Sequence, residues 1–209
     1  GIKLRDMQAH IHEKEEPGET NDHARLHGPD ASPHGDDVSD TGHGIVDGKD
    51  PHTWMNPLLV KQQAKTIADT LCELAPRHQD RFQANYRQFA HNLDQLYERL
   101  HRLLAPLAGT NLFVFHPAFG YFADAFDLNQ IPVETMGRSP KGKELAAIIQ
   151  LARQEKARVI FVQPQFDAQA ARKIAQAVNG AVVSIDPLAY DYLNNLARMG
   201  DTISNALTP

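Results

Sequence analysis

The sequence predicts an α/β protein in which a parallel sheet with flanking helices is joined by one long helix to the rest of the chain. Two observations support this fold class. From residue 110 onward, short apolar runs alternate with helical stretches, which is typical of a parallel sheet covered by helices. Before that point, residues 77–105 carry apolar positions spaced alternately by four and three, with no Gly or Pro among them, and this pattern predicts a single helix.

Residues 10–48 form the first distinct segment, which is rich in His, Asp, Glu, Gly and Pro. Such a segment cannot bury enough apolar surface to offset its ordering entropy, so we expect an irregular loop. It contains six of the eleven histidines, namely His10, His12, His23, His27, His34 and His43. His-rich tracts are typical of weak metal collection, although a solvated acidic loop remains the alternative.

Two helices are expected next. Residues 58–74 have helical apolar spacing, and Pro76 ends the pattern. The helix predicted over 77–105 would be roughly 44 Å long at the usual rise per residue. In a chain of 209 residues, a helix of that length is predicted to be a strut between two lobes.

The C-terminal part is predicted to contain four strands, each followed by a helix. Short runs of β-branched and aromatic residues are typical of strands that are covered on both faces. The expected strands are 112–115, 131–133, 158–162 and 181–185; the helices that follow end near 126 or span 143–155, 168–178 and about 188–207.

Charge and cysteine content exclude some alternatives. The net charge of −5 argues against a nucleic-acid partner, because phosphate binding requires clustered Lys and Arg. The single cysteine, Cys72, cannot form an internal disulfide, and its position in an apolar helical pattern predicts an inert core residue. Nucleophile and phosphate-binding motifs such as G-x-S-x-G and G-x-x-x-x-G-K-[ST] do not occur in the sequence.

Polar residues follow the predicted strands, where an open parallel sheet binds its ligands. His116 follows the first strand; it is either functional or a histidine that caps a helix or is buried and hydrogen-bonded. Glu134 follows the second strand; it could be a ligand, but we expect a solvated loop charge. Asp186 follows the last strand and could ligate a cation or cap the final helix.

Another candidate, His52, lies in the segment DPHTWMNP at residues 50–57. Asp50 can accept from local N–H groups and Pro51 fixes the turn, so the histidine is expected to be well positioned. A plain helix-initiating turn remains the alternative. Imidazoles combined with a carboxylate form a donor set that suits zinc.

Five segments occur in an order that resembles a known family. They are DPHTWMNP, RFQANYRQFAHNLDQLYERL, FVFHPAFGYF, RVIFVQPQF and SIDPL. The chain resembles the periplasmic zinc-binding proteins of ABC transporters, the ZnuA-like branch of a cluster of substrate-binding proteins that also serves manganese and includes adhesion-associated lipoproteins. The resemblance covers essentially the whole chain, including the acidic His-rich loop.

The resemblance implies two α/β lobes, joined by a rigid backbone helix, with the metal held between them. Residues 1–76 would then be the remainder of the N-terminal lobe, including the loop at 10–48. Residues 77–105 would be the linking helix and residues 106–209 the C-terminal α/β lobe. Family members carry a further metal-ligating histidine ahead of the His-rich loop. Because this chain starts at GIKLRDM, we expect that most of the first lobe and that ligand are missing.

By motif position, the resemblance implies metal ligation by His52 and His116, with either Asp186 or water completing the site. Histidine at position 116 favours Zn²⁺ over Mn²⁺, since glutamate there would indicate the manganese branch. The implied function is capture of zinc in the periplasm and delivery to an ABC permease of the inner membrane, by a monomer that catalyses no reaction. A zinc-dependent enzyme and a manganese-binding protein of the same family are the alternatives.

Overall fold

The computed structural model describes residues 1–7, 48–134 and 137–208. Nearly all of the predicted His-rich loop, with its six histidines, lies outside these residues. Within them, a four-stranded parallel sheet in the order β2-β1-β3-β4 is covered by helices on both faces. The α/β fold class predicted from the sequence is therefore confirmed.

The sheet is built from four short strands. They are β1 (Asn111–Val114), β2 (Asn129–Pro132), β3 (Val159–Val162) and β4 (Ala181–Ser184). Their neighbouring helices are α3 (Gly120–Ala125), α4 (Lys143–Gln154), α5 (Gln169–Ala177) and α6 (Tyr192–Leu207). Each strand lies within two residues of its predicted position, because β-branched and aromatic residues in a short run fit a sheet buried on both faces.

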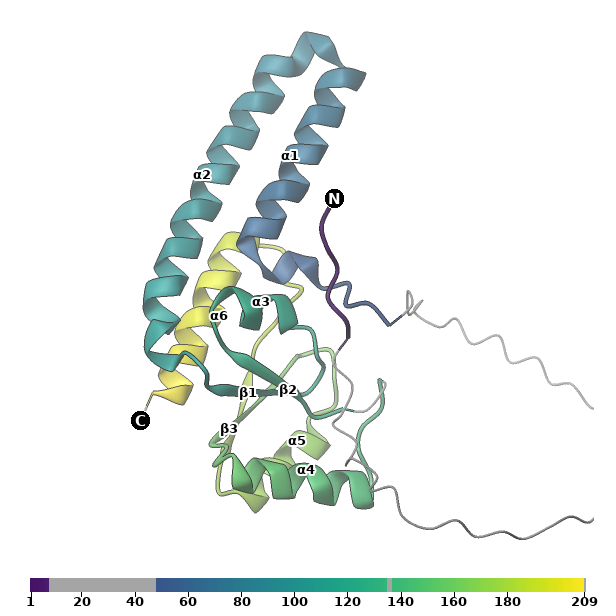
Figure 1. The fold of residues 1–209 in the computed structure, drawn as a ribbon, viewed down its shortest axis with the longest axis vertical. Coiled ribbons are helices and arrows are strands. Elements are labelled where there is room, and N and C mark those ends of the chain that lie inside the picture. The colour runs from purple at the N-terminus through teal and green to yellow at the C-terminus, as the bar shows by residue number, and fades with distance from the viewer. Residues whose placement is uncertain (8–47, 135–136, 209) are drawn as a thin grey trace, which may run out of the picture.

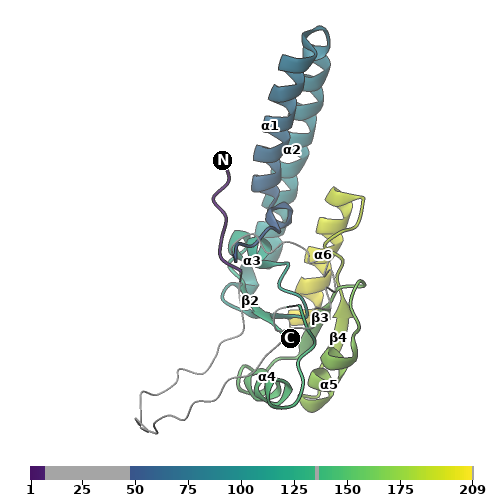
Figure 2. The ribbon, with the colours of Figure 1, turned by 90° about the vertical axis from the view of Figure 1, so that its right-hand side faces the viewer.

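Alternation along β1 and β3 divides the core into two layers. Leu112, Val114 and Phe161 belong to a cluster that also includes residues of α2, α3 and α6. Phe113 and Ile160 belong to the opposite cluster, which includes residues of α4 and α5. Successive side chains of a strand point to opposite faces, so each buried strand contributes to both layers. Figure 2 shows α4 and α5 on one side of the sheet and α6 on the other.

A long helical hairpin extends from this body (Figure 1). Its helices are α1 (Pro57–Leu74) and α2 (Gln79–Leu104), joined by the 3₁₀ turn Pro76–His78. The strut predicted at 77–105 is thus a helix of 26 residues, but part of it also belongs to the hydrophobic core. Leu96, Leu100 and Leu104 are buried in the core, because the C-terminal half of α2 packs against α6. The domain boundaries remain a prediction.

The remaining elements position the site. Residues 1–7 lie antiparallel to residues 48–50, with Asp50 N–H donating to Arg5 O at 2.9 Å. The 3₁₀ turn Thr53–Met55 leads into α1, which Asn56 caps by accepting from Leu58 N–H. In the part of the chain that the structure describes, no helix combines the length and apolar character needed to cross a membrane.

Candidate metal centre

The carboxyl ends of the strands carry the polar residues that the sequence predicts there. His116 lies two residues beyond β1, Glu134 two residues beyond β2, and Gln163 directly follows β3. Gln163 is fully buried and makes two hydrogen bonds to the backbone of His116. Its Nε2 donates to His116 O at 2.7 Å, and its Oε1 accepts from His116 N–H at 3.2 Å. The side-chain amide of Gln163 thereby fixes the chain where the histidine leaves the sheet.

His52 is positioned by Asp50, two residues before it. Asp50 Oδ1 accepts both from the His52 backbone N–H at 2.9 Å and from the ring Nδ1 at 2.7 Å. The carboxylate is almost completely buried, with 1% of its surface exposed. A single carboxylate oxygen therefore fixes both the turn and the orientation of the imidazole.

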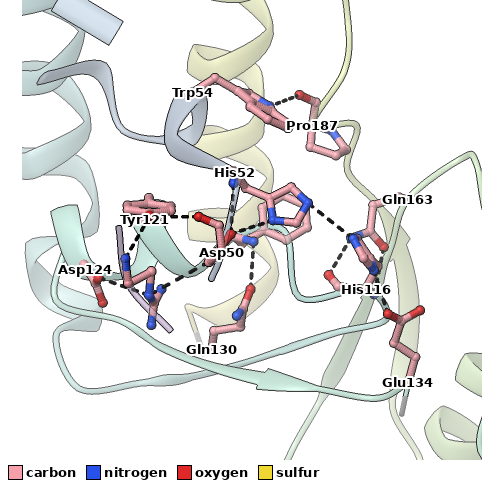
Figure 3. Close-up of polar contacts among 12 residues, drawn as sticks. Asp50, His52, Trp54, His116, Tyr121, Asp124, Gln130, Glu134, Gln163 and Pro187 are labelled. Carbon is pink, nitrogen blue, oxygen red and sulfur yellow. Dashed lines mark hydrogen bonds and ion pairs between the residues drawn. The ribbon is translucent and has the colours of Figure 1, made fainter. Parts of the chain in front are cut away.

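The two imidazoles meet edge to edge. His52 Nε2 lies 3.3 Å from His116 Nε2, and the ring centroids are 5.2 Å apart at an angle of 78°. Figure 3 shows both rings between Asp50 on one side and Glu134 on the other. Residues 64 positions apart in the sequence thus converge, as sequence analysis expects of two ligands; their role as ligands stays a prediction.

Glu134 orients the second ring as Asp50 orients the first. Its Oε1 lies 2.7 Å from His116 Nδ1, and the residue is only 5% exposed. The expectation of a solvated loop charge is therefore wrong. The reason is that Val133 and Glu134 continue the backbone pairing with the end of β1, which carries the glutamate side chain inward. Phe166 stacks on the face of His116, with centroids 5.0 Å apart.

The chemistry of the pair follows from these contacts. An ionised carboxylate can only accept, so each Nδ1 carries the proton of its short hydrogen bond. In the neutral rings the lone pairs are then on the two Nε2 atoms, which face each other at 3.3 Å. That arrangement is favourable only with a cation between the nitrogens, either a proton or a metal ion. In metal sites, a ligating histidine usually donates its other N–H to an outer-shell partner, often a carboxylate.

Asp186, the third predicted ligand, makes different contacts. Its Oδ1 accepts from Gln165 Nε2 and from Leu188 N–H, both at 2.9 Å, and its backbone oxygen accepts from Asn195 Nδ2. No hydrogen bond or ion pair of the described residues joins Asp186 to either imidazole. Those residues also contain no group of three or more His, Cys, Asp or Glu side chains arranged to hold a metal ion.

The contacts of Asp186 also correct the predicted final helix. Asp186 caps the turn at Leu188, so α6 starts at Tyr192 and not near residue 188. This turn reaches the segment that carries His52: Trp54 Nε1 donates to Pro187 O at 3.0 Å, and Tyr192 Oη donates to Trp54 O at 2.9 Å. Burial raises the pKa of the Tyr192 phenol above its ordinary value, so the hydroxyl remains a neutral donor.

The other sequence candidates lie elsewhere. His78, His91 and His101 are exposed along the hairpin. Cys72 is only half-buried, so its prediction as a core residue is wrong. Sequence reasoning missed Asp50 and Glu134 as partners of the two imidazoles. For Asp50 a signal exists, since an acidic residue two positions before a histidine can reach Nδ1 across a proline turn.

Comparisons with known proteins identify the family of the chain. The family model described as "Zinc-uptake complex component A periplasmic" matches residues 1–206. The high-affinity zinc uptake system protein ZnuA of Yersinia pestis is 29% identical over 96% of this chain and 63% of its own length. The corresponding protein of Haemophilus influenzae is 30% identical over 66% of this chain and 41% of its own length.

Solved structures show the same relationship. A crystal structure of ZnuA has a TM-score of 0.75 and 38% identity, covering 77% of this chain and 63% of that one. A zinc-bound deletion mutant of ZnuA has a TM-score of 0.73 and 37% identity, covering 80% and 64%. The chain thus spans less than two thirds of the length of these relatives. With its family model matched from residue 1 to residue 206, the chain belongs to the ZnuA family of periplasmic zinc-uptake components.

Proposed function

We propose that this protein is a zinc-binding substrate-binding protein that delivers the ion to an ABC permease from the periplasm. The observation that carries the proposal is the separation of 3.3 Å between the Nε2 atoms of His52 and His116. Two nitrogens that share a tetrahedral zinc ion at the usual bond length lie about 3.3–3.4 Å apart. The spacing of the pair therefore fits one zinc ion with little rearrangement.

The charges around the pair support the same function. Two buried carboxylates, Asp50 and Glu134, flank two imidazoles, so a divalent cation would neutralise a site with an excess of negative charge. Imidazole nitrogens suit zinc better than manganese, which prefers oxygen ligands. We therefore propose Zn²⁺ as the transported ion and Mn²⁺ as the weaker ligand.

The third predicted ligand, Asp186, remains part of the proposal. Its Oδ1 would have to leave Gln165 and Leu188 before that oxygen could reach a metal ion. Zinc titration of the Asp186→Asn variant tests this directly. A loss of affinity as large as that of His116→Ala would assign the carboxylate to the site, and unchanged affinity would assign the position to water.

Transport explains this site better than catalysis does. Catalytic zinc requires a general base beside the metal-bound water. Asp50 and Glu134 each use an oxygen to hold Nδ1, on the side of the ring away from the paired Nε2 atoms. Neither is directed at a water that a metal ion would hold. A carrier needs only reversible binding, so we propose no enzymatic activity, and a monomer that contacts the permease transiently.

Competition titration with zinc, manganese and nickel tests the proposal. In His52→Ala or His116→Ala we expect zinc affinity to fall by about 100-fold or more, because the loss of a ligand should exceed the 10- to 100-fold that outer-shell partners contribute. His101→Ala is the matched control, because His101 is an exposed histidine of α2. Wild-type zinc affinity in His116→Ala would show that the pair of histidines does not bind the ion, and it would refute the transport proposal.

A further inference from the structure

A third charged residue, Arg5, lies behind the carboxylate that holds His52. Asp50 presents Oδ1 to His52 and Oδ2 to the guanidinium of Arg5, whose Nε lies 4.0 Å away. The Arg5 side chain is 20% exposed and that of Asp50 only 1%. The guanidinium of Arg5, the carboxylate of Asp50 and the imidazole of His52 thus follow one another from the N-terminal segment to the metal centre.

Several contacts hold Arg5 in this position. Its backbone N–H donates to Tyr121 Oη at 3.0 Å, and the Tyr121 hydroxyl donates to Asp50 O at 2.9 Å. Asp50 N–H donates to Arg5 O at 2.9 Å, which closes a ring of three residues. The guanidinium lies over the Tyr121 ring, 5.7 Å from its centroid, and Nε lies 3.5 Å from Asp124 Oδ2.

Gly120 leaves the space that the guanidinium occupies. A Cβ at position 120 would overlap Arg5 Nη1, and it would lie 2.6 Å from Arg5 Cζ and 2.9 Å from Asp50 Oδ2. The residue is the first of helix α3, so its backbone conformation accepts alanine. Gly120 thus has no side chain at the point where the arginine and the carboxylate meet. Its identity is a second, independent observation that this contact requires space at position 120.

We propose that Arg5 is a positioning residue of the zinc site, which acts through Asp50 on His52. The inference rests on the proposed function. A carboxylate with a guanidinium at Oδ2 keeps Oδ1 toward His52 and so maintains the ring with its proton on Nδ1 and its lone pair on Nε2. Without Arg5, the carboxylate can rotate, and His52 can then exchange its proton between the two nitrogens.

The direction of the effect separates positioning from simple electrostatics. Removing a positive charge near a cation site lowers repulsion, so a purely electrostatic role predicts tighter zinc binding in Arg5→Ala. Positioning predicts that zinc binding weakens by about tenfold. This is the lower limit of the losses typical for outer-shell partners, because Arg5 contacts the outer-shell carboxylate and not the ligand itself. Arg5→Lys keeps the charge without the planar fork and should restore only part of the affinity.

A double-mutant cycle tests the inference without relying on deletion of the arginine alone. Gly120→Ala should weaken zinc binding by displacing the guanidinium; added to Arg5→Ala it should cost less than it does alone, because only its contact with Asp50 Oδ2 then remains. Losses that multiply in the double variant would overturn the coupling. Arg99→Ala, which breaks an exposed ion pair between α2 and α6, is the matched control and should bind zinc as the wild type does.

A spectroscopic readout distinguishes positioning from a general loss of stability. In the zinc-free wild type, ¹⁵N chemical shifts should report a proton on His52 Nδ1, whether or not Nε2 shares a proton with His116. In Arg5→Ala they should report a mixture of Nδ1–H and Nε2–H forms. His116, held by Glu134, should not change and is the internal reference. An unaltered His52 spectrum, or unchanged or tighter zinc binding, refutes the role of Arg5. Wild-type affinity in His116→Ala would instead refute the proposed function itself.

Discussion

Substitution of Glu134 by glutamine offers the sharpest test of how the proposed zinc site is built. The variant keeps an oxygen acceptor 2.7 Å from His116 Nδ1 but removes the negative charge. Outer-shell partners of ligating histidines typically contribute 10- to 100-fold to metal affinity. We expect a loss within this range, which corresponds to about 1.4–2.8 kcal/mol of binding free energy.

The zinc-free protein should tolerate this substitution. Glu134 Oε2 is buried and makes no hydrogen bond with residues in the described part of the chain. In the glutamine variant, the amide nitrogen takes the place of this oxygen and also has no partner there. The free energy of unfolding without zinc should therefore change little. With zinc in excess, the weaker binding lowers stabilisation by the same 1.4–2.8 kcal/mol. For a chain of about this size, that reduces the zinc-induced rise in Tm by about 3–11 °C.

The assay is thermal unfolding with and without saturating zinc, together with a competition titration. Glu98→Gln is the control, because Glu98 is an exposed glutamate of α2 that pairs only weakly with Arg102. Equal zinc-induced Tm shifts in Glu134→Gln and in the wild type would refute the argument that the buried carboxylate strengthens the His116 ligand. A large loss of Tm without zinc would show that Glu134 has mainly a structural role.

Three further predictions concern other parts of the chain. Gln163→Leu removes both hydrogen bonds to the backbone of His116 and should lower zinc affinity by about tenfold, measured by competition titration; unchanged affinity would contradict the role of this amide. Leu100→Ala should cost about 2–5 kcal/mol in urea unfolding, since this fully buried side chain joins α2 to the core. Deletion of residues 10–44 should leave one tight zinc site and remove weaker ones; loss of the tight site by metal analysis would mean that this segment supplies a ligand.

Much of the fold could be predicted because its signals are local. The strands and the hairpin helices follow from short apolar runs and from spacing by three and four residues, and their ends lie within two residues of expectation. The start of α6 could not be predicted, because it depends on how Asp186 and Asn195 close the preceding turn across nine residues. Similarly, the partial burial of α2 depends on the face that α6 covers.

The convergence of His52 and His116 could be predicted, because both lie in specific sequence motifs; their role as ligands stays a prediction. The outer shell of the site could not be predicted, because Glu134 becomes buried only when β2 pairs with β1, and Arg5 reaches Asp50 only through contacts 45 residues apart. No local pattern reports such contacts. Residues that hold a ligand in place are therefore harder to find in one sequence than the ligand itself.

The contacts of Trp54 have a consequence for kinetics. Trp54 is fastened to Pro187 and Tyr192, so the turn that carries His52 is tied to the loop between β4 and α6. Movement of this turn away from that loop would have to break these hydrogen bonds. If the chain carries zinc as proposed, the residence time of the ion would then depend on how often these two hydrogen bonds open.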